Sequence, residues 1–244
     1  MLDTPQTLKH SKSRIISTVL SPAIGLWLRS QVDQVEDLQF KIIGGDRQIL
    51  KGHIPQVSVS ASRAVYQGLH LSNIKLDGCD IRVNLGQVIK GKPLRLLEPV
   101  PVVGQVLLLK GDLQVSLESP LLSNALTEFL ELLLKTNKIT NLGEDIKARS
   151  IAWQQIDIGA GQVTIVGTLA DGTLGMMSIV IRAGIQLATP QELRLYPLEV
   201  EIPPILPLRH LEAFQVDLGP EVDIQELTLT SEQLICRGRL TVLP

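Results

Sequence analysis

Most of the chain alternates between apolar and polar residues. The alternation runs through residues 40–85, 105–118 and 151–242, with glycines and prolines between the runs. A two-residue period is typical of strands that have one buried and one exposed face. No regular exchange of strands with helices is visible, so we expect mostly antiparallel sheets. Within the first run, the shift of the pattern between Leu71 and Ile74 predicts a β-bulge.

Three segments follow a helical pattern instead. Ser21-Pro22 and Ser119-Pro120 each place an N-cap residue in front of a proline at the first helical position. They predict helices over about residues 22–36 and 119–136. A short third helix is expected near residues 207–213.

The helix predicted over residues 119–136 has an unusually wide apolar face. Its apolar residues cover about 220° of a helical wheel, whereas a surface helix needs roughly 100°. An arc this wide requires cover on more than one side, and a sheet curled around the helix provides it. The predicted fold class is therefore α+β, with a long amphipathic helix packed in a strongly curved, mostly antiparallel β-sheet that forms a half-barrel.

The composition excludes several classes of protein. The chain has 244 residues, of which 44% are hydrophobic and 20% charged, so it is too apolar for a disordered protein. A net charge of −2 and an aromatic content of 3% argue against a nucleic-acid-binding surface. The two cysteines, Cys79 and Cys236, are far apart, which excludes a disulfide framework and a paired-cysteine metal site.

The N-terminal segment is basic and amphipathic. Lys9, Lys12 and Arg14 precede an apolar run that is shorter than the roughly 20 residues needed to span a bilayer. Pro22 within the run and Arg29 after it argue against a cleavable signal peptide. We therefore expect an intracellular protein that is soluble or peripherally attached to a membrane. The three basic residues are the predicted membrane-docking residues.

No catalytic or metal-binding signature stands out. Residues 86–93 match the GxxxxGK frame of a phosphate-binding loop, but Pro93 occupies the position of the Ser or Thr that would ligate magnesium. The four histidines are not at metal-ligand spacing. We expect a protein that is not an enzyme and that uses neither cofactor nor metal.

Charge is distributed unevenly along the chain. Residues 41–95 contain nine basic and three acidic residues, a net charge of +6, whereas residues 191–232 contain two basic and nine acidic residues, a net charge of −7. Two interpretations are open. The first stretch forms a basic face for anionic lipid head groups, or the two stretches lie side by side and neutralise each other.

Several segments together resemble a known family. They are SPAIGLWLRSQVDQVEDL (residues 21–38), GDRQILKGHIP (45–55), AVYQGL (64–69), RVNLGQVIKGKPL (82–94) and SPLLSNALTEF (119–129). In texture and order they resemble the LmeA-like phospholipid-binding family, in its cyanobacterial branch. The resemblance implies a relation to tubular lipid-binding proteins, in which acyl chains lie between a long helix and a curved sheet. It implies a lipid carrier, and no single lipid-contact residue follows from a shared motif.

The sequence therefore predicts a basic segment over residues 1–20 and one lipid-binding α+β domain over residues 21–244. The domain is expected to bind a phospholipid or a similar amphiphile. An anionic membrane surface is a possible further partner, and no binding of nucleic acid is expected. The helical faces predict the residues of the groove, which are Ile24, Trp27, Leu28, Leu122, Leu126, Phe129, Leu130 and Leu133. Each of them is equally compatible with an ordinary core. The alternatives are a membrane-associated scaffolding protein without a cavity, and an unrecognised hydrolase or transferase.

Overall fold

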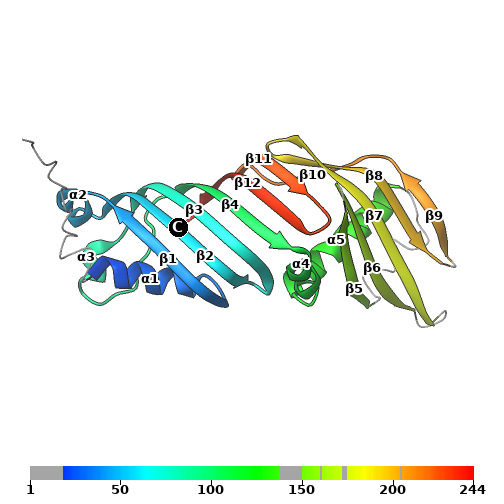
Figure 1. Cartoon of the computed structure of the whole chain (residues 1–244), viewed down its shortest axis with the longest axis horizontal. Helices are drawn as coiled ribbons and strands as arrows, with labels where there is room; N and C mark the ends of the chain where they lie inside the picture. The colour runs from blue at the N-terminus through cyan, green and yellow to red at the C-terminus, as the bar shows by residue number, and fades with distance from the viewer. Residues whose placement is uncertain (1–18, 138–149, 160, 172–174, 204) are drawn as a thin grey trace, which may run out of the picture.

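The computed structural model describes residues 19–137, 150–159, 161–171, 175–203 and 205–244. These residues form two antiparallel sheets of six strands each. The sheets follow each other along the longest axis of the molecule, and each is accompanied by helices of its own (Figure 1). The prediction of mostly antiparallel sheets with a few helices is confirmed.

The first sheet combines the N-terminal strands with the last two strands of the chain. Its order is β1-β2-β3-β4-β12-β11. The strands are β1 (Gln34–Ile43), β2 (His53–Tyr66), β3 (Leu69–Arg82), β4 (Val100–Leu109), β11 (Val222–Leu229) and β12 (Gln233–Val242). The pairing of β2 with β3 keeps one register from end to end, so the predicted bulge near Leu71 is wrong. No residue is inserted there, although Arg63 of β2, close to this point of the pairing, adopts a φ of 47°.

The second sheet is built from consecutive strands. They are β5 (Ile151–Gly159), β6 (Gln162–Asp171), β7 (Gly175–Thr189), β8 (Glu192–Ile202), β9 (Leu206–Leu211) and β10 (Phe214–Asp217). The prediction of a helix near residues 207–213 is wrong, because β9 pairs with β8 through Val200 and Arg209. The edge of β8 offers unpaired backbone groups, and pairing with them outweighs the weak helical preference of a short segment.

Five helices complete the described part of the chain. They are α1 (Ser21–Ser30), α2 (Asp46–Leu50), α3 (Leu85–Val88), α4 (Lys110–Ser116) and α5 (Pro120–Thr136). The predicted start of α5 is confirmed, since the Ser119 hydroxyl accepts a hydrogen bond of 3.1 Å from the backbone N–H of Leu122. α1 ends six residues earlier than predicted, because Gln34 already pairs with Val65 as the first residue of β1.

The segment that forms α4 was predicted as part of a strand, and this prediction is wrong. Leu113, Val115 and Leu117 have strand spacing, yet residues 110–116 are helical. The carboxylate of Asp112 accepts a hydrogen bond of 2.8 Å from the backbone N–H of Leu109 and so caps the first turn. Val115 is exposed and Leu117 is buried, which a half-buried strand would not allow for two residues of the same face.

The predicted half-barrel is not what forms. The sheets are neither closed nor strongly curled, and no single sheet wraps one long helix. The wide apolar arc of α5 is covered on one side only, since Leu121 and Leu132 remain 40% and 52% exposed. The inference from the arc to a curled sheet fails because a helix can leave part of a wide apolar face in water.

The described residues form two separate hydrophobic cores. One lies between α1 and the first sheet and includes Leu20, Ile24 and Ile54. The other lies between α5 and the second sheet, where Leu130 and Leu133 have no exposed surface. α5 is held there also by the edge-on contact of Phe129 with Phe214, at 5.4 Å between ring centroids, and by a hydrogen bond from Trp153 Nε1 to Thr127.

Helix α4 connects the two sheets. Toward the first sheet, the Ser116 hydroxyl accepts a hydrogen bond of 2.8 Å from the backbone N–H of His70, and Asp112 accepts one from Ser72. Toward the second sheet, the Gln114 amide bonds to the backbone of β5 at Gln154 and Ile156. Because the helix is bonded to both sides, it sets the relative position of the two cores at the junction.

An ion pair at this junction predicts how stability depends on pH. Lys110 Nζ lies 2.6 Å from Asp157 Oδ1, and the hydrogen bond and charge lower the pKa of Asp157 and raise the pKa of Lys110. The contribution of Asp157 is therefore present at neutral pH and is lost as the pH falls below about 3.9, through the lowered pKa. The contribution of Lys110 is lost only as the pH rises above about 10.4.

We expect Lys110→Met to make the urea midpoint less dependent on pH between neutrality and the acid range. The effect is small because both side chains are exposed. Lys75→Met, at an exposed lysine of β3, serves as the control and leaves the profile as in the wild type. Identical profiles for Lys110→Met and the wild type would contradict the assignment.

Candidate functional site

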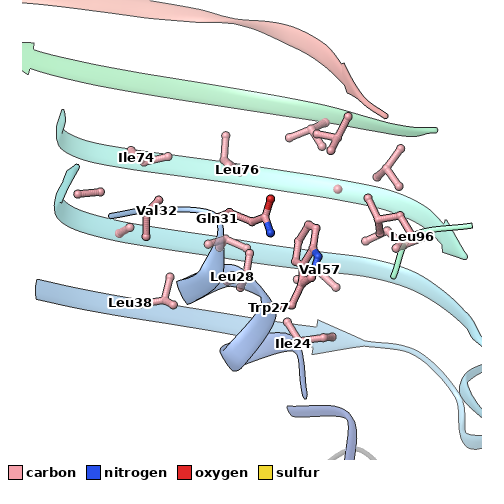
Figure 2. A pocket seen from close by; sticks show the side chains of 18 of the residues that line it. Ile24, Trp27, Leu28, Gln31, Val32, Leu38, Val57, Ile74, Leu76 and Leu96 are labelled. Atoms are coloured by element: carbon pink, nitrogen blue, oxygen red, sulfur yellow. The ribbon is translucent and has the colours of Figure 1, made fainter. Parts of the chain in front are cut away.

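A cavity of about 390 Å3 lies between α1 and the first sheet. Among the described residues, 24 line it, and none of these is charged. Figure 2 shows Trp27 and Leu28 projecting from α1 over the strands, which contribute Val57, Ile74 and Leu76 on the opposite wall. The lining is aliphatic with few exceptions, so the cavity suits an apolar occupant.

The cavity exists because α1 is too short to cover the sheet. Leu20 and Ile24 anchor the first turns of the helix in the core, where they are 0% and 5% exposed. Gly25 allows a close approach to β1, since a Cβ there would lie 3.3 Å from the ring of Phe40. The helix then ends at Ser30, whose hydroxyl donates a hydrogen bond of 2.7 Å to the carbonyl oxygen of Trp27.

Small residues on the strands leave the space open beneath the helix. Ala61 and Ala64 of β2 and Gly78 of β3 line the cavity at positions where larger side chains would fill it. The lining follows β2 from Ile54 to Ala64, which is about 33 Å at the usual rise of a strand. An acyl chain in one leaflet spans only about half of the roughly 30 Å hydrocarbon core of a bilayer. The cavity is therefore long enough for acyl chains.

Of the described lining residues, three carry polar side-chain atoms, and these are Trp27, Gln31 and Tyr66. Gln31 Nε2 donates a hydrogen bond of 3.2 Å to the Ser30 hydroxyl, and the Tyr66 hydroxyl accepts one from Gln67. No His, Asp or Glu of the part of the chain that the structure describes lines the cavity. Among the described lining residues, Tyr66 is the one whose side chain is of a type used in acid–base catalysis.

The structure separates the predicted groove residues into two groups. Ile24, Trp27 and Leu28 of α1 do line the cavity. The five residues predicted on α5 belong to the core of the second sheet, and they are Leu122, Leu126, Phe129, Leu130 and Leu133. The structure does not bring the two groups together in one groove. Contact of the α5 residues with lipid stays a prediction.

Two further sets of residues complete the comparison with the sequence. The predicted docking residues Lys9, Lys12 and Arg14 lie outside the described residues. The strand residues of the cavity wall, such as Val59 and Ala61, were not predicted as site residues. The sequence did contain a signal, because small residues at alternating positions leave room beside one face of a strand. The signal is not specific, since many sheets without a cavity have the same pattern.

A comparison with protein families decides which group of proteins this chain resembles. The model of the LmeA-like phospholipid-binding family matches residues 12–239, nearly the whole chain. The chain belongs to this family. Comparisons with the curated proteins and with the solved structures gave no match.

Membership of the LmeA-like family indicates which kind of molecule an apolar cavity in this chain would bind. The family description names phospholipid as the bound molecule, which supports lipid binding by this chain. In the part of the chain that the structure describes, no helix is long and apolar enough to cross a membrane. Nor do the described residues contain a group of three or more His, Cys, Asp or Glu side chains placed to hold a metal ion.

Proposed function

We propose that this protein binds a phospholipid non-catalytically, with acyl chains in the cavity between α1 and the first sheet. The observation that carries the proposal is the uncharged cavity of about 390 Å3 in a chain of the LmeA-like family. Its volume is within the range of roughly 300–1,000 Å3 that is usual for small-molecule sites. Acyl chains need smooth apolar walls and few directional contacts, which aliphatic side chains provide.

The energetics of an empty cavity support an apolar occupant. Empty apolar volume in a core costs about 24 cal/mol per Å3, so 390 Å3 corresponds to about 9 kcal/mol. This is an upper figure, because part of the cavity is open to water. It is nevertheless comparable to the whole stability of a typical domain, about 5–15 kcal/mol. Filling the space with methylene groups, each contributing about 0.8 kcal/mol on burial, removes this cost.

The polar residues of the lining suggest where the polar part of the lipid lies. Trp27 lies in the second half of α1, Gln31 directly follows the helix, and Tyr66 lies at the end of β2. In the proposed complex, the indole and amide N–H groups donate hydrogen bonds to ester or phosphate oxygens, and the acyl chains extend along β2 and β3. Peripheral association with a membrane, where the lipid would be exchanged, belongs to the same proposal.

The alternatives are weaker. A scaffolding protein has no need of a cavity, whereas the first core contains one. A hydrolase or transferase acting in this cavity would lack a carboxylate or imidazole among the lining residues. Both features favour binding over scaffolding and catalysis.

The test is native mass spectrometry of the purified protein, followed by solvent extraction and lipid analysis. We expect phospholipid to be recovered at close to one molecule per chain. After delipidation, the protein is expected to take up phospholipid from liposomes, and movement of labelled lipid between two liposome populations distinguishes transfer from holding. Protein without copurified lipid that also takes up none from liposomes would refute the proposal.

A further inference from the structure

The end of the first sheet that carries α2 and α3 combines exposed apolar side chains with exposed cations. We call residues 46–51 and 86–98 the docking end; Figure 1 shows α2 and α3 together at the end of the molecule far from the second sheet. Leu50, Ile89 and Leu97 are 53%, 58% and 58% exposed there. Exposed large apolar residues occur elsewhere on the surface, but here the same two segments also carry exposed basic residues.

The charge of the docking end differs from that of the chain as a whole. It contains five basic residues and two acidic ones, a net charge of +3 in a chain of net charge −2. The basic residues are exposed, and they are Arg47, Lys51, Lys90, Lys92 and Arg95. Within the described residues, none of these five forms an ion pair with a carboxylate.

The acidic stretch of residues 191–232 does not neutralise the docking end. Within the described residues, its ion-pair partners are Arg182, His210 and Arg237, which belong to the second sheet and to β12. The residues of the stretch lie in β8 to β11, and β11 is the edge of the first sheet opposite β1. The charge pattern had two interpretations, a basic face for head groups or mutual neutralisation of the two stretches. The ion pairs of the described residues agree with the basic face.

The docking end is a rigid platform. Gly52, with a φ of +77°, closes the turn after α2, and its carbonyl oxygen accepts a hydrogen bond of 2.8 Å from the backbone N–H of Val83. A Cβ at Gly52 would lie 2.5 Å from the Val83 oxygen, so only glycine fits. The buried Asn84 side chain bonds to the backbone of Pro93 and Arg95, which fixes the segment beside α3.

The same segment is continuous with the cavity. Leu94 and Leu96 line the cavity, whereas Arg95 and Leu97, which alternate with them, are exposed. One side of this short segment therefore contacts the cavity and the other faces outward. A surface that meets the outward side lies only one layer of side chains from the cavity.

We propose that the docking end binds the surface of an anionic phospholipid bilayer. The five cations lie among the head groups, and Leu50, Ile89 and Leu97 insert below them. Basic residues near an anionic membrane attract it through a field that salt screens. Apolar side chains at the interface add a contribution that salt does not weaken. The inference rests on the proposed lipid binding and adds the surface through which the protein meets its lipid source.

The test is cosedimentation of the full-length protein with vesicles of phosphatidylcholine, with and without phosphatidylserine. The wild type is expected to prefer the anionic vesicles, with weaker binding at high salt. The double variant Lys90→Glu/Lys92→Glu is expected to bind them at least about tenfold more weakly. The matched control Lys135→Glu/Arg209→Glu makes the same change of charge at exposed residues of α5 and β9, and is expected to bind like the wild type.

Apolar insertion is tested separately with Leu50→Ser/Leu97→Ser, which is expected to lose the part of vesicle binding that persists at high salt. Each variant is checked by thermal unfolding, and Lys90→Gln/Lys92→Gln replaces the glutamate variant if that one fails to fold. Lipid in the cavity, measured by native mass spectrometry, is expected to stay at the wild-type level in all variants. An empty wild-type cavity refutes the proposed function; equal binding of neutral and anionic vesicles, or equal losses in the lysine variant and its control, refutes the docking end.

Discussion

Replacing Ala61 by tryptophan is expected to reduce the phospholipid bound to the purified protein by about tenfold or more. Ala61 is 7% exposed and lies in the middle of the β2 wall of the cavity. An indole at this position occupies space that the proposed acyl chain would fill. Displacing two buried methylene groups, at about 0.8 kcal/mol each, already corresponds to more than a tenfold loss of affinity. Native mass spectrometry and lipid extraction measure the change.

The neighbouring residue provides the control for this experiment. Ser60 precedes Ala61 on β2, and its side chain points to the opposite face of the sheet. Ser60→Trp therefore adds the same side chain outside the cavity and is expected to keep the wild-type lipid content. The stability of Ala61→Trp is expected to remain close to that of the wild type, since the new side chain enters existing space. Full lipid content in Ala61→Trp would place the lipid elsewhere.

The second large effect is a loss of stability, and it is expected to differ between the two cores when a leucine of each is replaced by alanine. Leu133 of α5 has no exposed surface, so Leu133→Ala should destabilise the protein by about 2–5 kcal/mol. Leu28 of α1 is half-buried and already lines open space. Leu28→Ala should therefore cost only about 1 kcal/mol. Urea or guanidinium unfolding measures both changes.

The two tryptophans allow the cores to be followed separately. Trp27 lies at the cavity, and Trp153 lies in the second core, where its Nε1 bonds to Thr127 of α5. In a Trp27→Phe background, the fluorescence of Trp153 reports on the second core, and the effect of Leu133→Ala should appear in that signal. If Leu133→Ala instead loses bound lipid without loss of stability, the prediction that α5 contacts lipid gains support over the packing role.

Local signals in the sequence predict the elements well where the structure satisfies them locally. Ser119-Pro120 predicts the start of α5 because the cap is a bond between a side chain and a backbone group three residues away. Strands β7 and β8 of the second sheet follow the two-residue period because one face of each is buried. By contrast, β9 and α4 are set by the edge of β8 and by bonds to both sheets. Such partners are distant in sequence, and no local pattern reports them.

The candidate site was predictable in part for the same reason. The spacing of Ile24, Trp27 and Leu28 predicts one apolar face of α1, and that face does lie on the cavity. The apolar face of α5 is longer and wider, yet its residues Leu130 and Leu133 are fully enclosed in the second core. An apolar helical face is the same signal whether side chains or a ligand cover it. The opposite wall, with Ala61 and Gly78, depends on which strands lie under α1.

By itself, the sequence determined an aliphatic protein of mostly antiparallel strands with helices at two N-cap and proline signals, and its segments pointed to a phospholipid-binding family. These features depend on residue type and short-range order. Only the tertiary structure decided that there are two sheets with separate cores, that α5 fills one, and that α1 leaves about 390 Å3 open in the other. An apolar face is covered by side chains or borders a cavity depending on the volumes of the side chains that distant segments place against it. The periodicity of the sequence does not contain information on those volumes.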